Sequence, residues 1–403
     1  MSLRPTPGAA HAPGDESWPR VAEDTSRIWT PQAGRRLPAA DRRVHYTPSL
    51  PAAIAGRRPQ LSADTINLIT EAAAALIRSD ARNSGRSILA LLRTESAASS
   101  KIEQLEVKQR YVSRALAGLP TTQRSAKDVA ANLHALELAL ARAHEPVTPA
   151  TIDAVHRTLL PDEVWSGDIR TVQNWIGGSD YSPRGARHVP PDPAHLPRLM
   201  TDLSEFITGT DIPAIAQAAI THAQFETIHP YMDGNGRVGR ALTHLVLRRR
   251  AITPTTTAPL SVAILGDPDN YLESLSGYEN GEVDAYVADF AKTAMIAATM
   301  ADTLADHVDS IVDEWQAIPE VAGSRPDSVI HRIVPDLPSR PVTTVSLSAD
   351  RHGVSAPAAR NALETLTDVG VLNRTTAARN VQIYEAHEIF AAVEDIERTA
   401  RGV

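Results

Sequence analysis

The stretch from His229 to Arg240, HPYMDGNGRVGR, concentrates the side chains of this chain that could carry out chemistry. His229 is the one group here whose ordinary pKa, about 6.5, suits proton abstraction near neutral pH. Asp233 offers hard carboxylate oxygens of the kind that Mg²⁺ accepts when it bridges two phosphates. These residue types predict a site that holds phosphates and removes a proton.

The glycines and arginines of the stretch predict an anion-binding helix N-terminus. Gly234 and Gly236 flank Asn235 and allow the backbone N–H groups of all three residues to converge on an anion. Apolar residues then recur at helical spacing, so these N–H groups lie where the helix dipole favours phosphate. Arg237 and Arg240 share one helix face and can both clamp phosphate oxygens.

Two other interpretations explain the stretch less well. Residues 234–239 match the glycine pattern of dinucleotide-binding proteins, but that pattern requires a strand before it and an acidic residue about 20 positions later. A helical pattern precedes it instead, and residues 241–266 contain no Asp or Glu. A purely structural turn at a helix start leaves the close spacing of six chemically apt residues unexplained.

The stretch resembles the signature of the Fic (filamentation induced by cAMP) family, His-x-Phe-x-Asp/Glu-Gly-Asn-Gly-Arg-x-x-Arg, with Tyr231 at the usual Phe. The resemblance implies a protein adenylyltransferase that moves AMP from ATP to a Ser, Thr or Tyr hydroxyl of a protein and releases pyrophosphate. It makes His229 the catalytic base and Asp233 the Mg²⁺ ligand. The nucleotide-binding residues that it implies are Gly234, Asn235, Gly236, Arg237, Gly239, Arg240 and, in a later helix, Tyr271. Gly236 argues against the phosphotransferase branch of the family, where Lys replaces this glycine.

A second segment, residues 95–104, resembles the inhibitory motif of Fic proteins, Ser/Thr-x-x-x-Glu followed by Gly or Asn. Ser99 and Glu103 lie one helical turn apart, so the hydroxyl could orient the carboxylate. Gln104 departs from the motif. A carboxylate placed against Arg240 would occupy the partner of the γ-phosphate and hold ATP in a wrong pose. A solvated glutamate on a helix is the alternative.

We predict a mainly α-helical fold in four parts. They are a disordered segment at residues 1–45, a Fic-type N-terminal helical region with the inhibitory helix at 46–160, a Fic-type catalytic core with a β-hairpin flap at 161–320, and a winged-helix module at 321–403. The first part carries Pro, Gly, Ala and scattered charges without a period, which disfavours a packed core. Ser62 and Thr148 are predicted to cap helices.

The flap is expected at residues 167–191, where short β-prone runs alternate with Gly and Pro. It resembles the Fic flap, which pairs by its backbone with an extended segment of the target. Helical patterns at 195–208 and 212–228 lead into His229. His222, Glu226 and His229 could also suggest a metal site, but no further ligand clusters near them.

The C-terminal module is expected to contain a helix, a turn at Gly353, a second helix and two strands near 371–374 and 381–384. This order resembles a winged helix, which is a frequent tail on Fic proteins. Between residues 342 and 381, four arginines stand against three acidic residues, which is a poor footprint for a phosphate backbone. Protein contact or self-docking is therefore at least as well supported as DNA binding.

The composition sets broad limits. The chain has 403 residues, enough for two or three domains, and its 42% hydrophobic content supports ordinary cores. A net charge of −8 gives no global attraction to nucleic acid or membrane. No apolar run of 18 residues and no signal-peptide pattern is present, and the lack of cysteine suits a reducing compartment, so a cytoplasmic location is expected.

Together these features predict an autoinhibited, Mg²⁺-dependent protein adenylyltransferase whose partners are ATP and a protein with an accessible hydroxyl, the chain itself being one candidate. One alternative is a Fic enzyme that uses another nucleotide or removes AMP with Glu103. Another alternative is a DNA-binding regulator that senses a nucleotide, which the intact His229 disfavours.

Overall fold

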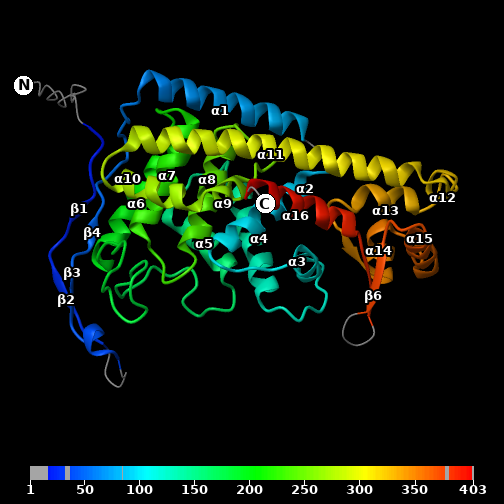
Figure 1. Cartoon of the computed structure of the whole chain (residues 1–403), viewed down its shortest axis with the longest axis horizontal. Helices are drawn as coiled ribbons and strands as arrows, with labels where there is room; N and C mark the ends of the chain where they lie inside the picture. Colours follow the sequence, from blue (N-terminus) through cyan, green and yellow to red (C-terminus); the bar gives the residue numbers. More distant parts are fainter. Residues whose placement is uncertain (1–16, 32–36, 84, 377–380, 402–403) are drawn as a thin grey trace, which may run out of the picture.

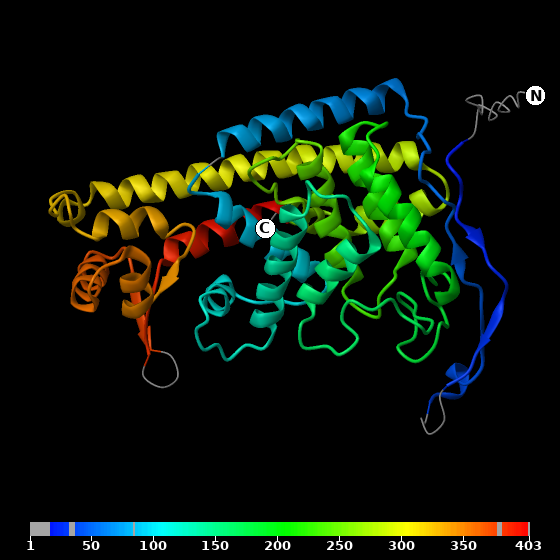
Figure 2. The same cartoon turned by 180° about the vertical axis from the view of Figure 1, so that it is seen from behind.

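A computed structural model of the chain describes residues 17–31, 37–83, 85–376 and 381–401, and they form a mainly helical structure, as predicted. Two long helices, α1 (Ala63–Arg82) and α11 (Val283–Ala317), lie side by side along one edge of the molecule (Figures 1 and 2). With 35 residues, α11 is about 50 Å long. It therefore reaches from the catalytic core to the C-terminal module.

The helices that position the signature pack beneath α11. They are α4 (Ser125–Ala141), α5 (Pro149–Leu159), α6 (Leu196–Thr208), α7 (Ala214–Ile228) and α8 (Asn235–Arg249). Helix α7 is buried over almost its whole length, its polar side chains included, so it lies at the centre of the core. The signature loop joins the end of α7 to the start of α8, so the core fixes both ends of the loop.

Both predicted caps are confirmed. The Ser62 hydroxyl accepts a hydrogen bond from the Thr65 N–H at the start of α1. Thr148 and Thr151 form a reciprocal capping box ahead of α5, with Pro149 in the first turn. These contacts satisfy backbone donors that helix ends leave unpaired.

Helix α2 (Ile88–Ile102) is buried on nearly all sides between the catalytic core and the C-terminal module, and α3 (Gln109–Leu116) follows it. The molecule has two large hydrophobic cores. Along α11, the buried residues up to Ala298 belong to the first core and most of those from Ala301 to Trp315 to the second, which also includes Ala90, Leu91 and Ala98 of α2. The change of core thus occurs inside α11 rather than at the predicted boundary of residue 321.

Residues 1–45 were predicted to be disordered, but the part of this segment that the structure describes is ordered. Strand β1 (Ala22–Glu23) pairs with β4 (Ser49–Leu50), and β2 (Arg27–Trp29) pairs with β3 (Val44–Tyr46). A short 3-10 helix, η1, covers Ala39–Asp41. Trp18 is buried against Tyr278, so tertiary packing orders a stretch whose composition predicts none. Residues 1–16 and 32–36 lie outside the described residues.

The predicted hairpin flap is a loop with a single antiparallel bridge between Ile176 and His188. Gly177 and Gly178 both have positive φ, and a Cβ on Gly178 would lie 2.5 Å from the carbonyl carbon of Gly185. The two arms therefore approach too closely at the tip for a regular ladder of side chains. Pro190 also lacks the N–H that would continue the pairing.

Two helices between the signature helix and α11 complete the wall of the site, α9 (Leu260–Gly266) and α10 (Pro268–Glu279). Asp267 caps α10 by accepting from the Asn270 N–H. Among the helices that the structure describes, none has both the length and the apolar character needed to cross a membrane.

The C-terminal module contains short helices and a three-stranded sheet in the order β5-β7-β6. Its elements are α12 (Pro319–Ala322), α13 (Ile330–Asp336), β5 (Val342–Thr343), α14 (Val345–His352), α15 (Ala356–Asp368), β6 (Asn373–Thr376) and β7 (Gln382–Glu385). Gly353 takes the left-handed conformation between α14 and α15, where the sequence predicts the turn. The tip of the predicted wing, residues 377–380, lies outside the described residues.

A last helix, α16 (His387–Ala400), was not predicted. It leaves the sheet and runs back along the catalytic core, against α11, α9, α3 and α2 (Figure 1, red). The module is thereby fastened to the helix that carries the predicted inhibitory motif.

Candidate active site

The His229 side chain is aimed by its own backbone. His229 ends α7 in the left-handed conformation, with φ 45° and ψ 62°, which is unusual for a residue other than glycine and marks functional sites. Arg170 holds this conformation, because its Nε donates to the His229 carbonyl at 3.0 Å and its N–H donates to the Pro230 carbonyl at 2.9 Å. The flap segment therefore fixes the imidazole at the mouth of the signature loop.

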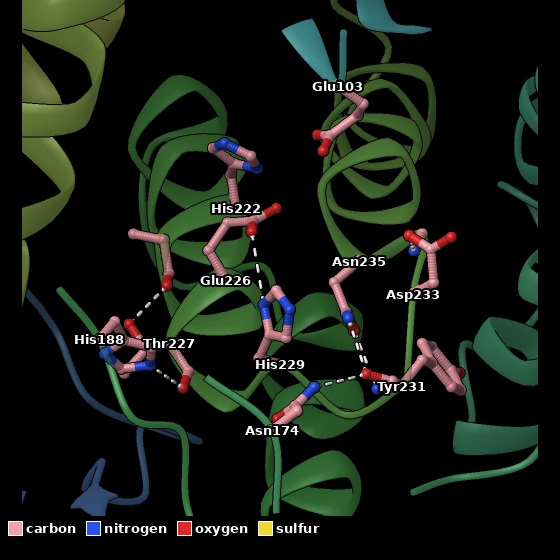
Figure 3. A network of polar contacts seen from close by, with 12 residues as sticks. Glu103, Asn174, His188, His222, Glu226, Thr227, His229, Tyr231, Asp233 and Asn235 are labelled. Atoms are coloured by element: carbon pink, nitrogen blue, oxygen red, sulfur yellow. Dashed lines mark hydrogen bonds and ion pairs between the residues drawn. The ribbon is translucent and has the colours of Figure 1, made fainter. Parts of the chain in front are cut away.

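The Asn235 side chain closes the signature loop on itself. Its Oδ1 accepts from the Tyr231 N–H and its Nδ2 donates to the Tyr231 carbonyl, both at 2.9 Å (Figure 3). Asn174 of the flap donates to the same carbonyl at 3.0 Å. The Asn235 side chain, which the resemblance assigns to the α-phosphate, is therefore hydrogen-bonded within the loop. The backbone N–H of Asn235, in the first turn of α8, remains available to bind an anion.

Tyr231 makes contacts that the usual Phe of the signature could make only in part. Its ring stacks on His156 at 3.8 Å between centroids, and its hydroxyl donates to Asp153 at 2.7 Å. His156 is buried, accepts from the Gly167 N–H and donates from Nε2 to the Asp233 carbonyl at 3.0 Å. The neutral His156 therefore holds the middle of the loop.

Burial favours the uncharged form of His229. Desolvation, followed by the nearby His188 and Arg170, lowers the pKa of His229 to about 3, so the imidazole is unprotonated at neutral pH. Its Nδ1 faces Glu226 at 4.0 Å and has no hydrogen-bond partner among the residues that the structure describes. A neutral imidazole can accept a proton, and Nε2 is the nitrogen directed away from Glu226.

Glu226 is a largely buried acid next to His229, and its sequence position suggested only a metal ligand. Desolvation raises its pKa to about 8, with Arg240 opposing and Glu103 reinforcing the shift. Its carboxyl group is therefore largely neutral at pH 7. Glu226 lies three residues before His229, on the side of α7 that faces α8 (Figure 3).

The predicted inhibitory segment contacts Arg240 through three hydrogen bonds. Arg240 Nη2 donates to Glu103 Oε1 at 2.9 Å and to the Ser99 carbonyl at 2.8 Å, and Nε donates to the Ser99 hydroxyl at 2.9 Å. The expectation that Ser99 orients Glu103 is wrong in detail, because the hydroxyl contacts the guanidinium. Burial alone would lower the pKa of Arg240, but Glu103, Tyr271 and Glu226 raise it above its ordinary value.

Glu103 lies directly over the start of α8. A Cβ at Gly236 would overlap its Oε1 and would lie 3.0 Å from Arg240 Nη1, so only glycine leaves room for the carboxylate. Gln104 has φ 61°, in the region that favours Gly and Asn. This geometry explains why the motif usually continues with those residues, and Gln104 adopts the same backbone at a cost.

The Fic resemblance implies that Gly239 and Tyr271 both bind the nucleotide, but only Tyr271 lines the pocket. Gly239 faces α7, where a Cβ would lie 2.6 Å from Glu226 Oε1, so it allows the two helices to approach and does not face the pocket. The Tyr271 hydroxyl hydrogen-bonds His222 Nε2 at 2.9 Å, and Tyr271 lines the pocket beside Arg240. His222 is therefore engaged by Tyr271.

Asp233 is exposed at the signature loop, and the buried Arg237 lies beside it. The Asp233 side chain is 69% exposed, its Oδ1 accepts from the Gly234 N–H at 2.6 Å, and Arg237 Nη2 is 3.7 Å from the same oxygen. Gly234 has φ 77° and needs to be glycine. An exposed carboxylate beside an anion-binding helix start fits Mg²⁺, which usually binds through one or two carboxylates, water and substrate phosphates.

One pocket of about 480 Å³ joins these groups. Of the predicted residues, Glu103, His229, Gly236, Arg240 and Tyr271 line it, and Ser99, Asp233, Gly234, Asn235, Arg237 and Gly239 do not. Its size is within the usual range for small-ligand sites.

The far end of the pocket contains residues that sequence analysis missed. Helix α10 contributes Leu272, Leu275, Ser276 and Glu279, and the flap contributes Trp175, Ile176, Gly177, Arg187 and His188. His188 joins the two sides, because Nδ1 is 3.0 Å from Glu279 and Nε2 donates to the Thr227 carbonyl at 3.0 Å. The spacing of the α10 residues places them on one helix face, but only the fold shows what that face opposes.

Comparison with known proteins agrees with this geometry. The family model described as the Fic/DOC family matches residues 146–247, which include α5, the flap, α7 and most of α8. The chain contains a Fic domain.

Named relatives of the Fic domain are protein adenylyltransferases. Protein adenylyltransferase fic-1 of Caenorhabditis elegans is 27% identical over 162 residues, which cover 37% of this chain and 30% of the relative. Protein adenylyltransferase Fic of Drosophila grimshawi is 31% identical over 113 residues, which cover 27% of this chain and 22% of the relative. The chain therefore spans less than a third of the length of these curated relatives.

The fold extends beyond the Fic domain. A Fic family protein from Desulfovibrio desulfuricans has a solved structure with a TM-score of 0.53 and 20% identity, covering 81% of this chain and 97% of that one. The arrangement of helices is thus shared over most of the chain.

Proposed function

We propose that the chain is a protein adenylyltransferase that transfers AMP from ATP to a hydroxyl group of a protein. The observation that carries the proposal is that the neutral His229 imidazole, the glycine-rich start of α8 and Arg240 border one pocket. The names of the relatives support the same chemistry.

The chemistry follows from the positions of these groups. The oxygen of the target hydroxyl attacks the α-phosphorus, its proton passes to His229 Nε2, and the bond to the leaving pyrophosphate breaks. The N–H groups at the start of α8 stabilise the negative charge of the reacting phosphate. Mg²⁺ held by Asp233 would neutralise charge on the leaving pyrophosphate.

The base of the nucleotide fits the far end of the pocket. Ile176 of the flap and Leu272 and Leu275 of α10 provide apolar walls, and Glu279 offers a carboxylate. A carboxylate accepts hydrogen bonds, so it favours a base with an exocyclic amino group. Adenine has such a group, and uracil has none.

The state seen in the structure is proposed to be the inhibited one. Glu103 occupies Arg240 and covers Gly236, where the outer phosphates of ATP are expected to bind. ATP that entered the pocket would meet a carboxylate at its most negative end. Release of Glu103 is then required for a productive pose.

The test is transfer of label from α-³²P-ATP to protein, with the chain itself and cell lysate as acceptors. His229→Ala should lose transfer by at least about 100-fold while retaining nucleotide binding, because proton abstraction and phosphate binding involve different residues. Asp233→Ala should lose transfer together with the Mg²⁺ dependence of ATP binding. His134→Ala, on the exposed face of α4, is the matched control and should keep full activity. Full transfer by His229→Ala would contradict the mechanism.

Removal of AMP is a second candidate, favoured by one observation. The Glu103 side chain is 37% exposed and borders the same pocket as His229, so it could activate water against an AMP-modified hydroxyl. Incubation of a labelled, AMP-modified acceptor with wild type and Glu103→Gly separates the two functions. Release of AMP that requires Glu103 would favour removal.

A further inference from the structure

A second cleft lies where the inhibitory helix meets the C-terminal module. It has a volume of about 400 Å³, is bordered by α2, α3 and α4 on one side and by residues 339–351 on the other, and shares no lining residue with the active-site pocket. Figures 1 and 2 show α3 and the C-terminal module on the same side of the molecule. No step of the proposed reaction uses this cleft.

Arg93 of α2 is a buried charge at this cleft without a counter-charge. It is 4% exposed, and its two terminal nitrogens donate to the carbonyls of Pro338 and Ser339. Throughout residues 17–31, 37–83, 85–376 and 381–401, no carboxylate forms an ion pair with it. Desolvation and then Arg340 lower its pKa to about 10. By contrast, the buried Arg240 has Glu103 as its partner.

The other charges of the cleft leave a positive excess. Arg340 and Arg351 share one carboxylate, Asp336, at 2.7 and 3.2 Å. Glu137, at the exposed edge of the cleft, pairs with His134 at 3.1 Å. Three guanidinium groups thus stand against two carboxylates, both of which already have partners.

A polar atom and an apolar wall complete the cleft. Ser113 is 4% exposed, and its Oγ has no hydrogen-bond partner among the described residues. A buried hydroxyl without a partner is costly, and a ligand that accepts its hydrogen bond would remove that cost. Leu89, Leu116 and Leu133, from the same three helices, α2, α3 and α4, add an apolar lining.

We propose that this cleft binds a small organic anion, with a carboxylate or phosphate head group at Arg93 and Ser113 and a short apolar body against Leu116 and Leu133. A buried guanidinium that has no carboxylate partner can bind such a head group strongly, through both charge and hydrogen bonds. The apolar wall excludes a bare inorganic ion as the best ligand.

Because of where the cleft lies, an anion bound in it should affect the active site. This expectation rests on the proposed function. Arg93 lies on the same helix as Ser99, which contacts Arg240. An anion that bridges α2 to the C-terminal module would stabilise α2 where it is and so reduce release of Glu103. We therefore expect the ligand to lower AMP transfer by wild type and to leave the activity of Glu103→Gly unchanged.

Binding is tested first, by calorimetry on the full chain with octanoate and octyl phosphate, which distinguish the two head groups, and with 1-octanol as the neutral analogue. Either anion should bind at least about tenfold more tightly than 1-octanol. Arg93→Gln should lose this preference, Ser113→Ala should weaken anion binding about threefold, and the exposed Arg198→Gln should bind like wild type.

Arg93 also joins α2 to residues 338–339, so its replacement could unfold the module. The Arg340→Gln/Arg351→Gln double variant avoids this problem, because both side chains are substantially exposed, and it should weaken anion binding at least threefold. Equal binding of 1-octanol, or unchanged anion binding by folded Arg93→Gln or by the double variant, would overturn the proposal. Because binding is measured without ATP, its failure is distinct from failure of the proposed transfer activity.

Discussion

At the scale of single residues, Arg240 is the group on which the proposed inhibition depends. It is buried and holds Glu103 and Ser99 through charge-assisted hydrogen bonds, which are stronger than neutral ones. Ser99 contacts Arg240 through both its hydroxyl and its carbonyl, and a substitution of Ser99 removes only the hydroxyl. Substitutions of Glu103 and Ser99 are therefore expected to differ in their effect.

Glu103→Gly is expected to raise AMP transfer at least about tenfold, because it frees Arg240 and removes the carboxylate over Gly236. Ser99→Ala should raise transfer only about two- to fivefold, since one hydrogen bond contributes about 1 kcal/mol. Initial rates of label incorporation measure both effects, with the exposed Glu106→Gly as the control. Arg240→Ala should stay inactive in the Glu103→Gly background. A wild-type chain that is already as active as Glu103→Gly would show that the contact is not inhibitory.

At the scale of elements, α2 links the active site to the C-terminal module. Ala90, Leu91 and Ala98 belong to the core of the module, while Ser99 faces Arg240. Near the C-terminal end of α2, Lys101 forms an ion pair with Glu397 of α16 at 3.2 Å. The position of Glu103 is therefore fixed by the module as well as by the Fic domain.

Lys101→Ala should raise AMP transfer about two- to fivefold, because it loosens the end of α2 two residues before Glu103. The increase should vanish in the Glu103→Gly background, where α2 has no inhibitory group left to hold. The charge-swapped pair Lys101→Glu/Glu397→Lys restores opposite charges and should return the rate toward that of wild type. An equal increase from Lys101→Ala in both backgrounds would exclude coupling through Glu103.

At the scale of the whole molecule, three histidines of the site are held in their neutral form, and this makes stability depend on pH. Desolvation is the main cause that lowers the pKa of His156 to about 4 and of His222 and His229 to about 3. In the unfolded chain these groups titrate near 6.5, so below that pH the unfolded state binds more protons and stability falls. Glu226 acts in the opposite direction, because its raised pKa of about 8 makes the folded state take up a proton between pH 8 and 4.5.

Three histidines outweigh one carboxyl group, so the free energy of unfolding should fall by roughly 1–3 kcal/mol per pH unit between pH 6.5 and 4.5. Urea unfolding at a series of pH values measures this slope. His156→Gln removes one titrating group, and the glutamine amide can still donate to the Asp233 carbonyl. The free energy of unfolding of this variant should change less steeply with pH. A stability that is constant or increases over this range would contradict the neutral assignment of the buried histidines.

The sequence alone predicted the chemistry proposed for the signature and determined most of the helices. The Fic resemblance rests on the local spacing of residues. The caps at Ser62 and Thr148 are local as well, because each hydroxyl accepts a hydrogen bond from the backbone N–H three residues later. The contact between Glu103 and Arg240 was also expected, since the inhibitory motif supplies the carboxylate and the signature supplies the arginine.

Only the tertiary structure decided the roles that depend on contacts between distant segments. The Asn235 side chain closes the loop, Gly239 faces α7, and Ser99 contacts Arg240 rather than Glu103. The order of residues 17–31 and 37–45 and the position of α16 also result from packing against remote helices. Local patterns determine which groups are available, whereas burial and pairing across the fold determine what each group contacts and which charge it carries.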